Sequence, residues 1–409
     1  MHVTGCLTHT GHNMQNKYIR MLNKDRKELE RMVKMQVKDE EILRLFQQIT
    51  VNNIRTRRQS IRKQDIENIK RKLNIKSPGL LHKDDEQSIL NWSINESKKG
   101  NNSNLLYYKP PGLECKYGIL AKEDLFLAIM SPSQVEMALK NLSLPDKIVC
   151  MDSTHGLNQY SFLLISLLTI DSFGNGYPCA HVYCNKETKE IVKLFLKCVK
   201  DRCGQLNCDA FMSDCAPVFF NAWVQVMCID KQPPARLWCS WHVQKNWFKK
   251  LKKIQNFEIK KKISSDLIKL RNQLDQLQFK KQLINFLEYC KLNAPTFEIY
   301  FRKYYSEIAV LWAYCYRKNF RINTNMMIEN LHRTIKKVYF SGRAIRRLDQ
   351  SLNTLIKLID DRYLKYLNLC EMGYATARTT SIAAHHRQAE EILTNTYIHR
   401  KKMVIMLLK

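Results

Sequence analysis

Three acidic residues, far apart in the chain, lie in settings typical of metal ligands. Asp152 follows the apolar run 148–151 and Asp214 closes "DAFMSD", so each is expected to end a buried strand. Glu329 lies in "NTNMMIENLHRTIK", which predicts a helix from about Asn325. Two carboxylates at neighbouring strand ends repel each other and call for a cation such as Mg²⁺. A third acid would complete a pair of metal positions about 4 Å apart, suited to phosphoryl displacement. Each acid taken alone is also explained as a turn cap or a solvated charge.

The elements around these acids follow a recognisable order. Strands are predicted at 148–152 and 160–170 and in "NGYPCAHVY", followed by a helix at 186–203, a strand ending at Asp214, a helix at 216–227 and a strand in "RLWCSW". This order predicts an α/β fold with a ribonuclease-H-like mixed sheet. The wholly helical pattern that follows, before the segment containing Glu329, predicts an all-helical insertion.

The sequence divides into segments by composition and pattern. Residues 21–104 form a basic helical region that resembles a helix-turn-helix module, although a plain helical linker domain fits as well. The predicted core spans 105–256 and is completed by 321–370, which carries the helix of Glu329. The insertion covers 257–320, and 371–409 is a basic helical tail.

The net charge of the chain indicates what kind of partner it binds. The chain has 409 residues, of which 67 are Lys or Arg and 38 are Asp or Glu, giving a formal net charge of +29. Such an excess favours a polyanion, and nucleic acid fits better than a membrane surface. The longest apolar run, 160–170, is too short to span a bilayer, and the N-terminus has no signal-peptide pattern. The 14 cysteines lack disulfide-framework spacing, which predicts reduced thiols and an intracellular, nuclear protein.

A dense basic run lies at the start of the helical segment. We expect it to contact DNA phosphates, with a solvated helix face as the alternative. Its members are Lys249, Lys250, Lys252, Lys253, Lys260, Lys261 and Lys262.

The motif "CSWH" places Cys239 and His242 three residues apart, which is half of a zinc site. Taken alone, a core cysteine beside a hydrogen-bonded histidine explains the pair better. Trp241 and Trp247 are predicted to be packing residues, and stacking on a splayed base is the alternative.

Several motifs together resemble Mutator-like element (MULE) transposases. They are "MDSTHGLNQYSF", "DSFGNGYPCAHVY", "FMSDCAPVFFNAW", "RLWCSWHVQKNW" and "NTNMMIENLHRTIK", in the family's order and within 146–367. The resemblance implies a DDE triad of Asp152, Asp214 and Glu329 that binds Mg²⁺ or Mn²⁺. It also implies cut-and-paste transposition in the nucleus by a homo-oligomer acting on terminal inverted repeats and target DNA. The C-x-x-H pair, Cys239 and His242, belongs to the family pattern, where it either orients the site or touches DNA.

The chain departs from that family at both ends. "CLTHTGHN" offers Cys6, His9 and His12, which look like the end of an N-terminal zinc finger, so residues 1–20 are interpreted as a remnant with an incomplete Zn²⁺ site. No SWIM-type finger follows the core, which indicates a truncated gene model or a decayed copy. The alternative function is therefore a domesticated or decayed DNA-binding protein without catalysis. The intact acid triad favours an active site, and no RNA-recognition motif supports an RNA-binding structural protein.

Overall fold

The chain forms two compact units. The computed structural model describes residues 20–35, 37, 39–47, 57–73, 80–145, 147–320, 322–340, 347–372 and 388. The units divide between residues 80 and 81, whereas the sequence placed the end of the basic helical region at 104. Helix α4 (Asp85–Ser97) consequently lies in the second unit, where it packs against the sheet and α13 (Leu348–Met372).

The N-terminal unit is helical, as predicted. It contains α1 (Asn23–Lys34), α2 (Asp39–Phe46), a 3₁₀ turn (Arg58–Ser60) and α3 (Lys63–Lys72). Apolar residues at helical spacing form its own small core, made of Leu29, Val33, Ile42, Phe46, Ile61, Ile66 and Ile69. Ion pairs such as Arg58 with Asp25, at 2.9 Å, neutralise part of its basic charge. A DNA-binding role for this unit stays a prediction.

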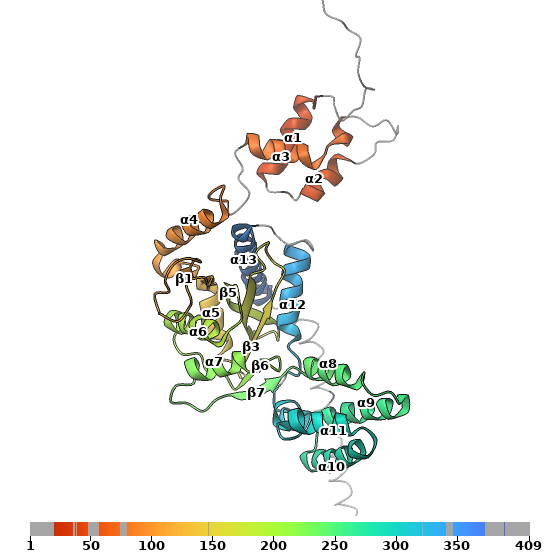
Figure 1. The fold of residues 1–409 in the computed structure, drawn as a ribbon. Coiled ribbons are helices and arrows are strands. Elements are labelled where there is room, and N and C mark those ends of the chain that lie inside the picture. Colours follow the sequence, from red (N-terminus) through yellow and green to blue (C-terminus); the bar gives the residue numbers. More distant parts are fainter. Residues whose placement is uncertain are drawn as a thin grey trace, which may run out of the picture. The chain divides into compact units, whose positions relative to one another are not determined.

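The second unit is built on a seven-stranded mixed sheet, drawn at the centre of Figure 1. The strand order is β1-β2-β5-β4-β3-β6-β7. The first five strands in this order pair antiparallel, whereas β3, β6 and β7 are parallel. The bounds are β1 (Leu105–Lys109), β2 (Phe126–Ile129), β3 (Ile148–Thr154), β4 (Leu163–Ile170), β5 (Gly176–Cys184), β6 (Ala210–Ser213) and β7 (Ala235–Trp238). The predicted mixed α/β sheet is confirmed.

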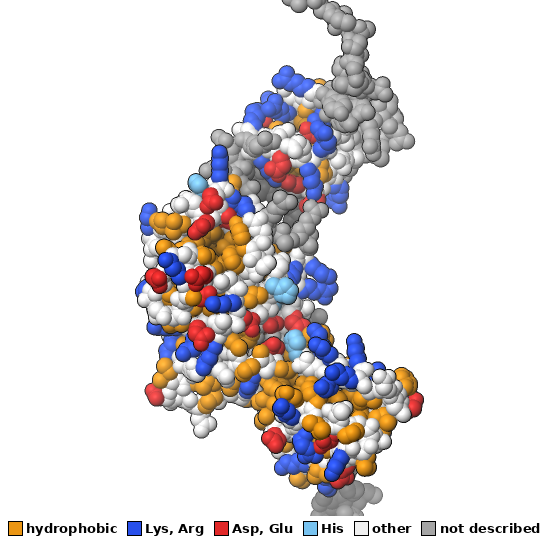
Figure 2. Space-filling view, viewed as in Figure 1, with side chains coloured by type: hydrophobic (Ala, Val, Ile, Leu, Met, Phe, Trp, Pro, Cys, Tyr) orange, Lys and Arg blue, Asp and Glu red, His pale blue; other side chains and the backbone are white. Residues whose placement is uncertain are grey.

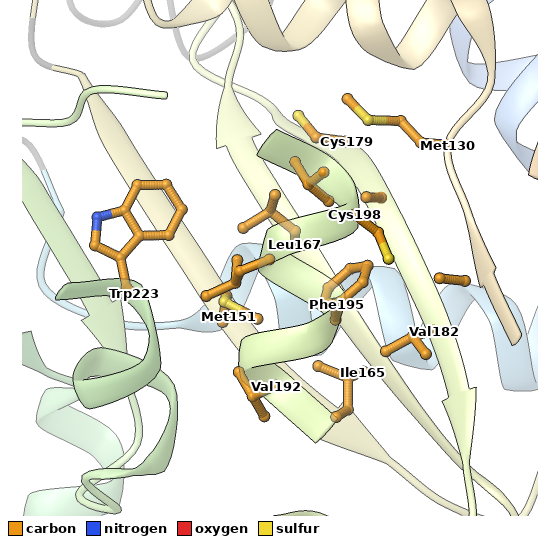
Figure 3. Packing of buried hydrophobic residues seen from close by; sticks show 14 of the residues in the cluster. Met130, Met151, Ile165, Leu167, Cys179, Val182, Val192, Phe195, Cys198 and Trp223 are labelled. Carbon is orange, nitrogen blue, oxygen red and sulfur yellow. The ribbon is translucent and has the colours of Figure 1, made fainter. Parts of the chain in front are cut away.

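Helices cover both faces of this sheet. On one face lie α5 (Pro132–Asn141), α6 (Lys189–Cys203) and α7 (Val218–Met227), whose apolar sides form a core with alternate residues of the strands. Figure 3 shows Phe195 of α6 and Trp223 of α7 over Met151 and Leu167 in this core. On the other face lie α4, α12 (Met326–Thr334) and α13. Because β3 is covered on both faces, its residues 148–151 are all buried.

The all-helical insertion follows β7. It comprises α8 (Ser240–Leu251), α9 (Phe257–Asn272), α10 (Gln276–Asn293), α11 (Pro295–Phe301) and short turns up to Tyr316, which lie together in Figure 1. Its core is rich in aromatic rings, with Trp247 and Trp312 fully buried at its centre. Helix α8 contributes to this core, so the insertion's packing begins at 240 rather than at 257.

Arg317 fastens the insertion to the sheet edge. Its guanidinium is fully buried and donates to the carbonyl oxygens of Trp238, Leu311 and Asn323 and to Ser240 Oγ. These partners belong to β7, α8, the insertion and the segment before α12. One side chain therefore fixes the junction through which the chain returns to the core.

The described residues bear on the expectations for membrane-spanning segments and for the cysteines. No helix among them is both long and apolar enough to cross a membrane. The cysteines in the described part of the chain are free thiols and most are buried, as their spacing predicted. The predicted tail at 371–409 lies almost wholly outside the described residues.

Candidate metal centre

Strand register places Asp152 and Asp214 side by side. In the parallel pair formed by β3 and β6, Ile148 lies opposite Ala210, an offset of 210 − 148 = 62 residues. The two aspartates differ by the same number, 214 − 152 = 62, so they occupy matching positions near the carboxyl ends of adjacent strands. Asp214 directly follows β6, whereas Asp152 does not end its strand as predicted, because β3 stays paired with β4 up to Thr154. Neighbouring strands lie about 4.8 Å apart, which puts the two carboxylates at one edge of the sheet.

Side-chain alternation directs both aspartates to the face covered by α12. Successive strand residues point to opposite faces, and Val149 and Met151 pack on the α6 side. Cys150 and Met212 pack on the α12 side. Asp152 comes two positions after Cys150, and Asp214 comes two positions after Met212. Both aspartates are therefore expected on the face of the sheet that α12 covers.

A buried polar chain anchors α12 to the sheet beside these acids. Ile328 and Leu331 pack into the core and leave Glu329, in the first turn, half-buried at the sheet edge. His332, one turn later, lies 3.1 Å from Ser166 Oγ, which lies 2.9 Å from His181 Nδ1. Burial lowers the pKa of both imidazoles to about 3, so both are neutral at pH 7.

The carboxylates form an electrostatically strained group. Burial raises the pKa of Asp152 to about 7, and repulsion from Asp214, Glu329 and Glu187 adds to the shift. Burial also raises the pKa of Glu187, again with repulsion from Asp214. Asp152 Oδ1 accepts a hydrogen bond from the Ser153 amide, at 2.9 Å. Asp152 therefore interacts electrostatically with the other two acids singled out from the sequence, Asp214 and Glu329, and with a further acid, Glu187.

Few cations of the protein balance this group. Within the described residues, no Lys or Arg forms an ion pair with it, and the one basic side chain within 4 Å is His242, whose Nδ1 lies 3.8 Å from Glu329 Oε1 and which is charged only when protonated. Arg236 on β7 interacts electrostatically with Asp214 but forms no ion pair with it among the described residues. A group of four acids with so little compensation fits divalent cations with oxygen ligands.

Glu187 is a site residue that the sequence analysis missed. It lies in the polar segment "NKET" between β5 and α6 and is half-buried, and the Ser153 side chain partly offsets the effect of burial on its pKa. Strand β5 is antiparallel to β4, which is antiparallel to β3, so β5 ends at the same sheet edge as β3. An acid three residues after that strand end was the available signal.

The C-x-x-H pair lies next to Glu329. Cys239 precedes α8 at the end of β7, and His242 lies in the first turn of α8. Strand β7 is parallel to β6, so this junction opens at the same sheet edge as Asp214. The ligand atoms of Cys239, His242 and Glu329 all lie within 4.8 Å of one another.

The two tryptophans differ in environment. Trp247 is fully buried in the insertion core, as predicted. The packing prediction for Trp241 is wrong, because its side chain is 47% exposed, with Lys245 Nζ 4.7 Å from the ring centroid. Trp241 lines a hollow of about 330 Å³ between α8, the insertion and the segment before α12, together with Arg271 and Met326.

The predicted DNA-binding lysines lie at the end of α8, in the following turn and on α9. Lys249, Lys252, Lys253, Lys261 and Lys262 are exposed, and Lys250 and Lys260 are half-buried. Figure 2 shows acidic side chains and a histidine gathered near the middle of one face, beside Lys and Arg side chains over the insertion. The N-terminal Cys6, His9 and His12 lie outside the described residues.

Comparison with known families gives one match to part of the chain. Residues 143–217 match the family described as "Zinc finger SWIM domain-containing protein 1/3, RNaseH-like domain". No curated protein matches the chain. The matched range runs from just before β3 to the start of α7 and contains Asp152, Glu187 and Asp214. It agrees with the observed sheet, and the core has the predicted ribonuclease-H-like fold.

Proposed function

We propose that this protein is a metal-dependent DNA transposase of the DDE type that cuts and rejoins DNA at the terminal repeats of an element. The observation that carries the proposal is the set of electrostatically interacting acids Asp152, Asp214, Glu329 and Glu187 near one sheet edge, with little compensating positive charge among the residues that the structure describes. The motif resemblance to Mutator-like transposases supports the same reaction. The match to a ribonuclease-H-like domain supports the fold that such chemistry requires.

The donor set suits Mg²⁺ or Mn²⁺. Asp152 and Asp214 offer carboxylate oxygens from β3 and from the end of β6, and Glu329 and Glu187 offer theirs from α12 and from the segment before α6. Hard divalent cations prefer such oxygen ligands and keep positions free for phosphate. Bound ions would be held by these four carboxylates and would supply activation of a water or 3′ hydroxyl and stabilisation of the leaving oxygen.

The protein's own groups supply position and charge. The strands hold both aspartates at matching register, and the contact between His332 and Ser166 holds the helix of Glu329 against the sheet. The lysines of α8 and α9 would hold duplex DNA through its phosphates, without reading its sequence. Nuclear location and assembly as a homo-oligomer on DNA are parts of the proposal.

Strand cleavage by matched variants tests this function. Asp152→Asn keeps the shape of the side chain and removes the charge, so it should bind DNA normally and nick it slower by orders of magnitude. Asp201→Asn makes the same chemical change at an exposed position of α6 and should nick like the wild type. The assay compares the proteins at equal occupancy of a duplex that carries the element's terminal repeat, with Mg²⁺ or Mn²⁺.

One outcome would overturn the transposase proposal in favour of a DNA-binding protein without catalysis. It is a wild-type protein that occupies this duplex in the presence of either metal and leaves every strand intact.

A further inference from the structure

We propose that Cys239, His242 and Glu329 form a second metal site, for a thiophilic transition-metal ion, of which Zn²⁺ is the natural candidate. The site lies beside the carboxylate group and shares Glu329 with it. It differs in chemistry, since a thiolate and an imidazole favour Zn²⁺ over Mg²⁺. Binding is testable without DNA, so this inference does not depend on the transposase proposal.

The distances fit a tetrahedral ion after small side-chain adjustments. Zn²⁺ binds nitrogen and oxygen at about 2.0–2.2 Å, which places two such ligand atoms about 3.4 Å apart. His242 Nδ1 lies 3.8 Å from Glu329 Oε1, and no pair of ligand atoms in the group is separated by more than 4.8 Å. The three residues would fill three positions and leave the fourth for water.

Two of the ligand atoms are buried without partners. His242 Nδ1 and Glu329 Oε1 have no hydrogen-bond partner in the described part of the chain, although neither is accessible to solvent. Leaving such atoms unsatisfied costs about 1–3 kcal/mol each. Their separation of 3.8 Å is too long for a hydrogen bond between them. A metal ion held between these two atoms satisfies both.

Burial raises the pKa of the Cys239 thiol, so the metal ion itself would have to stabilise the thiolate, helped by one backbone amide. Its sulfur accepts a hydrogen bond from the Asn325 amide at 3.2 Å. The sulfur also lies at the N-terminus of α8, where the helix dipole favours negative charge. Amide donors around a sulfur support a metal-bound thiolate, as outer hydrogen bonds do at other metal sites. Binding would release the thiol proton to solvent.

Chain topology explains how the site assembles. The C-x-x-H spacing puts Cys239 before α8 and His242 within its first turn, so one short segment supplies two ligands. The third comes from α12, and the Asn325 amide that bonds Cys239 also precedes α12. Asn325 is fully buried, and both polar atoms of its side chain lack partners among the described residues. The site would therefore join α8 to the helix that carries Glu329.

Cobalt titration of the full chain tests the inference, because Co²⁺ bound to a thiolate gives a charge-transfer absorption band in the near ultraviolet. All proteins carry Cys6→Ser, so that the N-terminal motif contributes no thiolate. The parent protein should show the band at one equivalent of Co²⁺, and Zn²⁺ but not millimolar Mg²⁺ should abolish it. Cys239→Ser should lose the band. His242→Asn should weaken binding by more than about 100-fold, because loss of a ligand exceeds the effect of an outer-shell change.

Two neighbouring or exposed thiols provide controls. Cys215 is an electrostatic neighbour of Cys239 outside the three-residue group, and Cys370 is exposed on α13. Cys215→Ser and Cys370→Ser should both keep the band. Absence of the band in the parent protein would overturn the inference by itself, whether or not the variants fold. Persistence of the band in a folded Cys239→Ser protein would do the same.

Discussion

Replacing Asp152 by Asn should stabilise the metal-free protein and abolish its stabilisation by Mg²⁺. Burial and three neighbouring acids raise the pKa of Asp152 from an ordinary 3.8 to about 7 in the folded state. The folded protein therefore holds this proton more tightly than the unfolded chain does. The contribution of the wild-type side chain to stability is fully present below pH 3.8 and is lost as the pH rises to about 7.

The size of the effect follows from the pKa difference. A pKa difference of one corresponds to about 1.4 kcal/mol of folding free energy. The difference between 3.8 and about 7 therefore means that ionised Asp152 destabilises the metal-free folded state by about 4 kcal/mol above pH 7. Asn carries no charge, and its Oδ1 can still accept the hydrogen bond from the Ser153 amide. Between about pH 5.5 and pH 8, the advantage of Asp152→Asn over the wild type should therefore grow by about 2 kcal/mol.

Urea unfolding with a chelator at these two pH values measures the difference. Adding Mg²⁺ at 100 times its dissociation constant should stabilise the wild type by about 2.7 kcal/mol and leave Asp152→Asn unchanged. Asp201→Asn, the exposed control on α6, should follow the wild type throughout. Equal unfolding free energies for wild type and Asp152→Asn at both pH values would refute the electrostatic reasoning.

Three further variants test other parts of the account. Ser166→Ala removes the hydrogen bonds to two buried histidines and should cost about 1–3 kcal/mol in urea unfolding; no loss would mean that α12 is held by apolar packing alone. Lys109→Met removes a buried ammonium that donates to three backbone carbonyls and should destabilise by about 3 kcal/mol in the same assay, and an unchanged midpoint would contradict this. Replacing the exposed Lys252 and Lys253 together by Ala should reduce the slope of log affinity against log salt by about 2 in DNA-binding titrations, whereas an unchanged slope would assign them to a solvated surface.

The local sequence pattern was sufficient to predict the mixed sheet and to predict that acids lie near the ends of two of its strands. The run before Asp152 is apolar at every position because β3 is covered on both faces, and the following acid marks where that cover ends. The face of the sheet to which Asp152 points could not be read from a run that is apolar at every position. That both aspartates share a register required the pairing of β3 with β6, which the sequence leaves open.

Residues brought in by long-range packing escaped prediction. Glu187 sits in a short polar segment with no periodicity, and its burial depends on how β5 ends relative to β3. The approach of Cys239 and His242 to Glu329 depends on the path of the whole insertion and on the anchoring of its end by Arg317. Tryptophan is usually a core residue, which is why Trp241 was predicted to be buried. Helix α8, however, packs on the insertion core with the face that carries Trp247, and Trp241 lies on another face.

The central claim, that the four carboxylates bind a pair of divalent cations, is tested most directly by electron paramagnetic resonance of Mn²⁺ bound to the protein–DNA complex. The protein is first saturated with one equivalent of Zn²⁺, so that the Cys239 site takes up no Mn²⁺. Two Mn²⁺ ions about 4 Å apart couple magnetically, and the wild type should give the spectrum of a coupled pair. Asp152→Asn should lose that spectrum and Asp201→Asn should keep it. A wild-type complex that holds no Mn²⁺, or only isolated ions unaffected by Asp152→Asn, would contradict the claim.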